Sequence, residues 1–220
     1  MALIDDESKK TLKERFEKEL AGDVSVIVFS TRINATPEQI EYAEFTQTLF
    51  KEISEISPRV KVSESTLLEE KALEYGIKTN PSVMIGEDKG YKIIFSGAPA
   101  GYEVMSVVET LILVSRGESG LSGESAGKIT SSSGTARVQV FVTPTCPYCP
   151  RAVILSHRVA IASAGRIVSE CVEAEENPQL SREFNVSAVP QQVINADTKS
   201  VTVGVQSEPE FVDQVVQHLK

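Results

Sequence analysis

The order of the predicted elements repeats once along the chain, and this repeat is the feature that most limits the possible folds. Each copy is predicted as strand–helix–strand–helix–strand–strand–helix, and one additional helix precedes the first copy. Parallel strands joined by a helix, followed by a late hairpin, predict an α/β fold in which helices flank a mixed central sheet. Three pairs of residues occupy equivalent positions in the two copies: Val24 and Val138, Pro81 and Pro190, and Gly97 and Gly204.

The length of 220 residues is enough for two domains of ordinary size. We interpret residues 1–115 as a first domain without cysteines and residues 137–220 as a second domain that contains all three cysteines. Residues 116–136 between them are rich in Gly and Ser, which is typical of a linker. An alternative is that Ile129 and its neighbours keep a remnant of a helix.

The charge balance argues against two classes of partner. The chain has 22 Lys and Arg residues against 31 Asp and Glu, which gives a net charge of −9. Such a surface repels phosphate backbones and anionic lipids, so we expect neither nucleic acid nor a membrane as a partner. The first residues lack the basic and apolar regions of a secretory signal, and no apolar run approaches the roughly 18 residues of a membrane span. We therefore expect a cytoplasmic protein.

Two of the three cysteines, Cys146 and Cys149, are separated by two residues. They follow a predicted buried strand, Val138–Val142, and open a helix predicted from Cys146 to Ala164. The unpaired N–H groups and the dipole at a helix N-terminus favour a thiolate over a thiol. One helical turn brings both sulfur atoms to the same face. We therefore predict that Cys146 attacks a substrate disulfide and that Cys149 resolves the mixed disulfide.

A zinc site is the alternative interpretation of this cysteine pair. A structural zinc ion needs four ligands, and the remaining candidates are Cys171, His157 and His218. His157 lies 11 residues beyond Cys146, about 16 Å along one helix, so these two residues cannot share a metal ion. The sequence also lacks the Gly-x-Gly-x-x-Gly fingerprint of a dinucleotide site. We predict neither a metal site nor a bound cofactor.

The Val189–Pro190 pair is the second part of the candidate site. A proline at the start of an interior strand cannot donate a ladder hydrogen bond. In this order of elements the Pro190 loop would lie beside the cysteines and present the Val189 backbone to an extended substrate. We assign substrate binding to Val189 and Thr145, and support of the active site to Pro190, Pro147 and Tyr148.

These motifs resemble the thioredoxin and glutaredoxin superfamily. The two-copy layout, with Cys146-Pro147-Tyr148-Cys149 in the second copy, resembles the glutaredoxin-like protein disulfide oxidoreductases of thermophilic archaea and bacteria. The resemblance implies two tandem thioredoxin-like domains, a cis Pro190 and a nucleophilic Cys146. It also implies that the electrons come from NADPH through a separate thioredoxin reductase, a flavoprotein.

The sequence departs from this family in three places. Arg32 and Ala35 occupy the positions that correspond to the two cysteines, so the first domain cannot perform thiol chemistry. The strand at Val138–Val142 lacks the buried acid that thioredoxins place beneath the cysteine pair. Ala188 replaces the threonine with which glutaredoxins bind glutathione. The sequence therefore does not decide whether glutathione is a direct substrate.

Several other residues carry simpler interpretations. Cys171 lies in a predicted strand and is expected to act as a small hydrophobic residue. His157 and His218 are expected at the surface or at an edge of their helices. The acidic cluster at Glu173, Glu175 and Glu176 is interpreted as a solvated loop.

The leading hypothesis is an enzyme, a thiol–disulfide oxidoreductase that acts on protein disulfides. Its first alternative is an electron relay that feeds a peroxiredoxin or a hydroperoxide reductase. Its second alternative is a client-binding or chaperone module without catalysis, whose client binding would survive Cys146→Ser.

Overall fold

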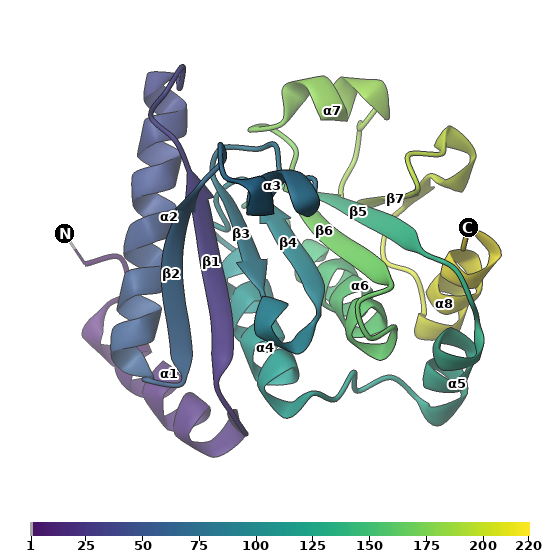
Figure 1. Ribbon diagram of the computed structural model, residues 1–220, viewed down its shortest axis with the longest axis horizontal. Coiled ribbons are helices and arrows are strands. Elements are labelled where there is room, and N and C mark those ends of the chain that lie inside the picture. Colours follow the sequence, from purple (N-terminus) through teal and green to yellow (C-terminus); the bar gives the residue numbers. More distant parts are fainter. Residues whose placement is uncertain (1) are drawn as a thin grey trace.

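One mixed sheet of eight strands runs through the computed structural model, which describes residues 2–220 (Figure 1). The N-terminal unit contains α1 (Asp6–Glu19), β1 (Val24–Ser30), α2 (Pro37–Ile56), β2 (Val60–Thr66), α3 (Glu70–Glu74), β3 (Ser82–Ile85), β4 (Lys92–Ser96) and α4 (Glu103–Arg116). The C-terminal unit contains β5 (Ala136–Val142), α6 (Cys149–Ala162), β6 (Ile167–Glu173), α7 (Pro178–Glu183), β7 (Gln191–Ile194), β8 (Thr202–Val203) and α8 (Glu208–Gln217). Between the units lies α5 (Gly123–Ser131). The predicted α/β class and the repeated order of elements are confirmed.

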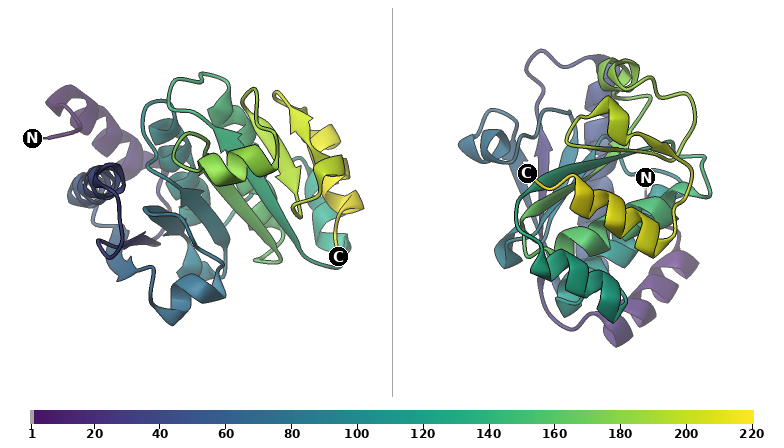
Figure 2. Two further views of the ribbon diagram at one scale, coloured as in Figure 1. Left: turned by 90° about the horizontal axis from the view of Figure 1, so that it is seen from above. Right: turned by 90° about the vertical axis from the view of Figure 1, so that its right-hand side faces the viewer.

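Each unit has the same strand pattern, and the two patterns join edge to edge. The strand order is β2-β1-β3-β4 in the N-terminal unit and β6-β5-β7-β8 in the C-terminal unit. In each unit the first two strands are parallel, the third pairs antiparallel with the first, and the fourth pairs antiparallel with the third. Strands β4 and β6 then pair in parallel, so the two expected sheets form one continuous sheet (Figure 2).

Alternation along the strands divides the apolar side chains between the two faces of the sheet. Val138 and Val140 of β5 enter the main core, which spans both units. Phe141 points to the opposite face, where it packs with Phe184 in a smaller cluster. A second small cluster, around Met84, includes Ala72 of α3. In Figure 1 α4 and α6 lie behind the sheet, and α3 lies in front of it.

The segment interpreted as a linker contains a helix. Ser122 caps α5, with its hydroxyl accepting the Ser125 N–H at 3.3 Å. Ile129 is fully buried in the main core, and the helix packs against α6 and α8. The alternative of a helix around Ile129 is therefore correct. The division into two domains at residues 115 and 137 stays a proposal, because one sheet and one core run through both units.

Candidate functional site

The two cysteines form a disulfide in the turn between β5 and α6, and their Cα atoms are 5.5 Å apart. The helix begins at Cys149, three residues later than the sequence analysis predicts. Residues 147 and 148 form a turn instead, and the Cys146 N–H donates to the Thr143 carbonyl at 3.1 Å. Cys146 thus precedes the helix and faces its N-terminus.

The surroundings of the two sulfur atoms differ. The Cys149 N–H, one of the unpaired donors of the first helical turn, donates to Cys146 Sγ at 3.2 Å. Cys149 is fully buried, whereas Cys146 is 8% exposed. Tyr148 between them is 64% exposed, and Thr145 and Pro147 are exposed as well. Cys146 is therefore the more accessible of the two cysteines, and Cys149 lies behind it.

The Pro190 loop lies beside the cysteine pair, as the sequence predicts. The Val189–Pro190 bond is cis, which confirms what the resemblance implies. The carbonyl oxygen of Val189 lies 3.8 Å from Cys146 Sγ. Pro190 is buried and Val189 is half-buried. The structure therefore brings Val189 to the cysteine pair, with its backbone next to Cys146 Sγ.

The turn before α4, in the N-terminal unit, contacts the active-site loop directly. The Tyr102 N–H donates to the carbonyl of Pro144, two residues before Cys146, at 3.0 Å. Gly101 adopts a left-handed conformation with φ of 58°, and a Cβ atom there would overlap the same carbonyl oxygen. Only a glycine lets this turn approach the loop so closely.

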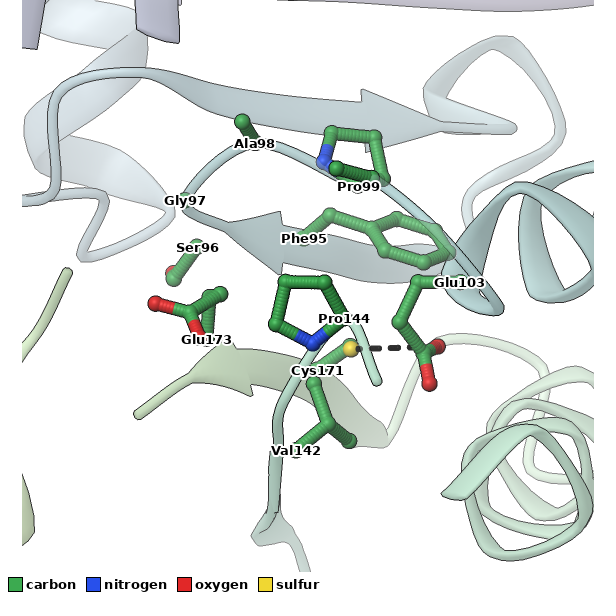
Figure 3. Close-up of a pocket in the computed structure, with 11 residues that line it drawn as sticks. Phe95, Ser96, Gly97, Ala98, Pro99, Glu103, Val142, Pro144, Cys171 and Glu173 are labelled. Carbon is green, nitrogen blue, oxygen red and sulfur yellow. Dashed lines mark hydrogen bonds between the residues drawn. The ribbon is translucent and has the colours of Figure 1, made fainter. Parts of the chain in front are cut away.

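Glu103, the first residue of α4, is a buried carboxyl that the sequence analysis missed (Figure 3). It is 2% exposed, and burial raises its pKa from 4.5 to about 7. Its Oε2 accepts a hydrogen bond from Ser106 at 2.6 Å, whereas its Oε1 is buried without a partner in the described chain. Pro144 and Glu103 line a cavity of about 10 Å³, near the smallest volume that holds one water molecule. Glu103 is thus a buried acid beside the active-site loop, where β5 itself supplies none.

Cys171 donates to Glu103 Oε2 at a sulfur–oxygen distance of 3.8 Å. It is buried, and this burial, followed by the charge of Glu103, raises the pKa of its thiol well above the ordinary value. A buried, protonated thiol is a poor nucleophile. The expectation of a small core residue agrees with this position.

The prediction that His157 lies at the surface is wrong. His157 is fully buried between α6 and α4, and its Nδ1 hydrogen-bonds Thr110 Oγ1 at 2.7 Å. Its ring packs edge-on against Phe95. Burial lowers the pKa of His157 to about 3, so the ring is neutral. The contact with α4 of the other unit is long-range, so the local sequence could not predict it. His218 is half-buried.

The interpretation of the acidic cluster as a solvated loop is wrong for two of its three residues. Glu175 is exposed, but Glu173 is only 5% exposed and Glu176 is half-buried. The Ala98 N–H of the N-terminal unit donates to Glu176 Oε2 at 3.0 Å. The pairing of β4 with β6 buries this loop under the loop that follows β4.

In the N-terminal unit, the position that corresponds to the active site is occupied by hydrogen bonds between Asn80 and the Thr31 backbone. The Asn80 side chain accepts from the Thr31 N–H at 3.1 Å and donates to the Thr31 carbonyl at 2.9 Å. Asn80 precedes the other cis proline, Pro81. Arg32, which replaces the first cysteine, pairs with Glu44 at 2.7 Å.

Residues 2–220 contain neither a candidate metal site nor a candidate membrane-spanning helix. No group of His, Cys, Asp and Glu side chains there has the arrangement of a metal site. No helix in the same range is both long and apolar enough to cross a bilayer.

Comparison with known proteins gives sequence relatives for the C-terminal unit and for most of the chain. Residues 136–217 match the family model for a thioredoxin domain. Thioredoxin from Methanocaldococcus jannaschii is 30% identical over 83 residues, which cover 38% of this chain and 95% of that protein. The alkyl hydroperoxide reductase AhpF from Staphylococcus aureus is 26% identical over 155 residues, which cover 68% of this chain and 27% of that protein.

Two solved structures share the architecture of the whole chain. A protein disulfide oxidoreductase from Aeropyrum pernix superposes with a TM-score of 0.85 at 29% identity, covering 96% of this chain and 91% of that one. The N-terminal domain of the alkyl hydroperoxide reductase AhpF from Enterococcus faecalis gives a TM-score of 0.81 at 23% identity and covers 96% and 99%. The second likeness concerns the fold alone. Both confirm that this architecture recurs in other proteins.

Proposed function

Because the chain belongs to the thioredoxin family, we propose that it is a thiol–disulfide oxidoreductase that acts on protein disulfides through Cys146 and Cys149. The observation that carries this proposal is the disulfide in front of α6, with the Val189 backbone beside its more exposed sulfur. The likeness to the disulfide oxidoreductase from Aeropyrum pernix over 96% of the chain supports it.

In the reductive direction the dithiol form starts the reaction. The Cys146 thiolate attacks one sulfur of the client disulfide, which breaks that bond and releases the other client sulfur as a thiolate. The Cys149 thiolate then attacks Cys146 Sγ, breaks the mixed disulfide and releases the second client thiolate, which takes up a proton. The client gains two electrons, and the enzyme is left with the Cys146–Cys149 disulfide of the present structure. In this scheme Thr145 and Val189 bind the client, and Pro147, Tyr148 and Pro190 hold the site.

Glu103 is proposed as the group that accepts the Cys149 proton in the second step. Cys149 is fully buried, so its proton needs an acceptor inside the protein. Glu103 has a pKa near 7 and an unpartnered oxygen, and it lies at the cavity that also borders Pro144.

The proposal also includes the source of the electrons and the partner proteins. We propose that no cofactor is bound and that NADPH reduces the Cys146–Cys149 disulfide through a separate flavoprotein of the thioredoxin reductase type. Protein disulfides are the proposed substrates. The cytoplasm, where thiols are kept reduced, is the compartment that suits this direction of electron flow.

The test is the reduction of insulin disulfides by dithiothreitol, followed by turbidity. We expect the wild-type protein to accelerate the reaction, Cys146→Ser to abolish the acceleration, and Cys149→Ser to accumulate a mixed disulfide with insulin. Cys171→Ser is the matched control, because serine keeps a donor to Glu103 and this buried position has no proposed role in exchange, and it should retain the acceleration. A wild-type protein that gives no acceleration contradicts the proposal.

A second candidate is an electron relay between a flavoprotein and a peroxiredoxin. The 155-residue match to the alkyl hydroperoxide reductase AhpF favours it. Peroxide turnover by a peroxiredoxin, with NADPH and a flavoprotein reductase, would then depend on added protein and stop with Cys146→Ser. Client binding that survives Cys146→Ser, without any turnover, would instead support the non-catalytic module.

A further inference from the structure

A pocket of about 230 Å³ opens beside the active-site loop, where the two units meet. Strands β4, β5 and β6 run in the same direction, so the loops that follow them leave the sheet at one edge. Ala98 follows β4, Pro144 follows β5 and Glu175 follows β6, and all three line this junction pocket. Open α/β sheets bind their ligands at this edge, beyond the carboxyl ends of the strands.

Four carboxylates line the junction pocket, and none forms an ion pair with a residue in the described part of the chain. They are Glu41 of α2 and the three residues Glu173, Glu175 and Glu176. Tyr42 and Phe45 of α2 complete the lining with aromatic rings. Burial, and then the charges of Glu176, Glu173 and Glu41, raise the pKa of Tyr42, so the carboxylates act on the same ring.

In addition to the four carboxyl groups unpaired within the described chain, the burial of Glu173 indicates a ligand in the junction pocket. Its side chain is 5% exposed, and its Oε1 is buried without a hydrogen-bond partner within residues 2–220. Its Oε2 accepts only the backbone N–H of Glu176, at 2.5 Å. A buried carboxyl oxygen without a partner costs free energy that a bound donor would recover. Burial raises the pKa of Glu173 and raises the pKa of Glu176 to about 7, and a cation bound in the pocket would favour their charged forms. The chain itself supplies no cation for this pocket within residues 2–220.

We propose that the junction pocket receives a lysine or arginine side chain of the client protein while Cys146 attacks the client's disulfide. The inference rests on the proposed oxidoreductase function and names the class of client. The cation would pair with the carboxylates, and its stem and charge would lie against the rings of Tyr42 and Phe45. The carboxylates lack the arrangement of a metal site, which favours a side chain over a metal ion.

The distance between the junction pocket and Cys146 Sγ limits how many residues can separate the client's basic residue from its reacting cysteine. Pro144 precedes Cys146 by two residues, so their Cα atoms are at most about 7.6 Å apart. An extended peptide advances about 3.3 Å per residue. The client's basic residue should therefore lie about two to four residues from its reacting cysteine.

The test compares disulfide-linked peptides that differ in a single residue. One series carries lysine at the second, third or fourth residue from the cysteine, and the matched series carries norleucine there. With dithiothreitol as the reductant, we expect kcat/KM of the wild-type protein to favour lysine about tenfold at the best position. The Glu175→Gln, Glu176→Gln double variant should reduce this ratio to near one. The Glu14→Gln, Glu118→Gln double variant removes the same two charges at exposed sites outside the pocket and should keep the ratio.

Charge reversal gives the complementary result. Glu175 is exposed, so Glu175→Lys should fold normally, and it should prefer a peptide with glutamate at the same position. Equal kcat/KM of the wild-type protein for all lysine and norleucine peptides would overturn the junction-pocket inference and leave the oxidoreductase function intact. Failure to reduce any peptide, together with inactivity toward insulin, would overturn the proposed function and the inference with it.

Discussion

Glu103 of the N-terminal unit is a buried carboxyl that contacts Cys171 of the other unit. Burial raises its pKa to about 7, so near neutral pH it can either hold or release a proton. The same burial makes its ionisation unfavourable in the folded chain. A carboxyl with a raised pKa binds its proton more tightly when folded, so its contribution to stability is greatest below pH 4.5 and declines as the pH rises toward 7.

Glu103→Gln should remove this pH dependence, because glutamine stays neutral and still accepts the Ser106 hydrogen bond. We expect the wild-type free energy of unfolding, relative to the variant, to decline by roughly 3 kcal/mol between about pH 4 and pH 8. Urea unfolding at several pH values measures this difference. A difference that stays constant with pH would show that Glu103 does not titrate in this range. If Glu103 accepts the Cys149 proton, the variant should also resolve the insulin mixed disulfide more slowly.

At the scale of elements, the active-site loop is held between two units. Cys146 follows β5, the Val189 backbone comes from the loop before β7, and Gly101 and Tyr102 come from the turn before α4. The close approach of Gly101 to the Pro144 carbonyl leaves no space for a side chain. The geometry of the cysteine loop therefore depends on a turn more than 40 residues earlier in the chain.

Gly101→Ala should displace the active-site loop, because the new Cβ atom would overlap the Pro144 carbonyl and because alanine disfavours φ of 58°. We expect a loss of about 1–3 kcal/mol of stability and a slower reduction of insulin. Gly127→Ala is the matched control: its Cβ would meet no atom within 4 Å in α5, so stability should rise by up to about 1 kcal/mol. Unchanged insulin reduction by Gly101→Ala would contradict the role of this turn.

At the scale of the whole molecule, the β4–β6 pairing joins the two units into one sheet. Glu170 of β6 accepts from Ser96 of β4 at 2.6 Å and from Arg137 of β5 at 2.7 Å. Arg137 also donates to the Tyr75 carbonyl of the N-terminal unit at 2.6 Å. Since the main core also spans both units, we expect neither unit to unfold alone.

Glu170→Ala should lower the free energy of unfolding by about 3 kcal/mol, because it leaves the Arg137 charge and the Ser96 hydroxyl without their buried partner. Glu118→Ala, at an exposed position, should stay within about 0.5 kcal/mol of the wild-type value. Hydrogen exchange of amides in β1 and β5 measures the two units separately, and we expect both to report one common transition. Separate transitions in the wild-type protein would contradict a single folding unit.

The sequence by itself determined the features that are encoded within a few neighbouring residues. Apolar alternation and periodicity located the strands and helices of both copies, and the spacing of Cys146 and Cys149 at a strand–helix turn indicated the redox pair. The helix begins at Cys149 instead of Cys146, because local periodicity places the ends of helices poorly.

Only the tertiary structure decided what surrounds the cysteines. Parallel pairing of β4 with β6 brings Glu103 to the active-site loop, buries Glu173 at the end of β6, and encloses His157 between two helices. The local sequence cannot specify these contacts, because burial of a charged or polar residue depends on which strand edges meet. That choice depends on the free energy of the whole sheet and its core, to which residues from both units contribute.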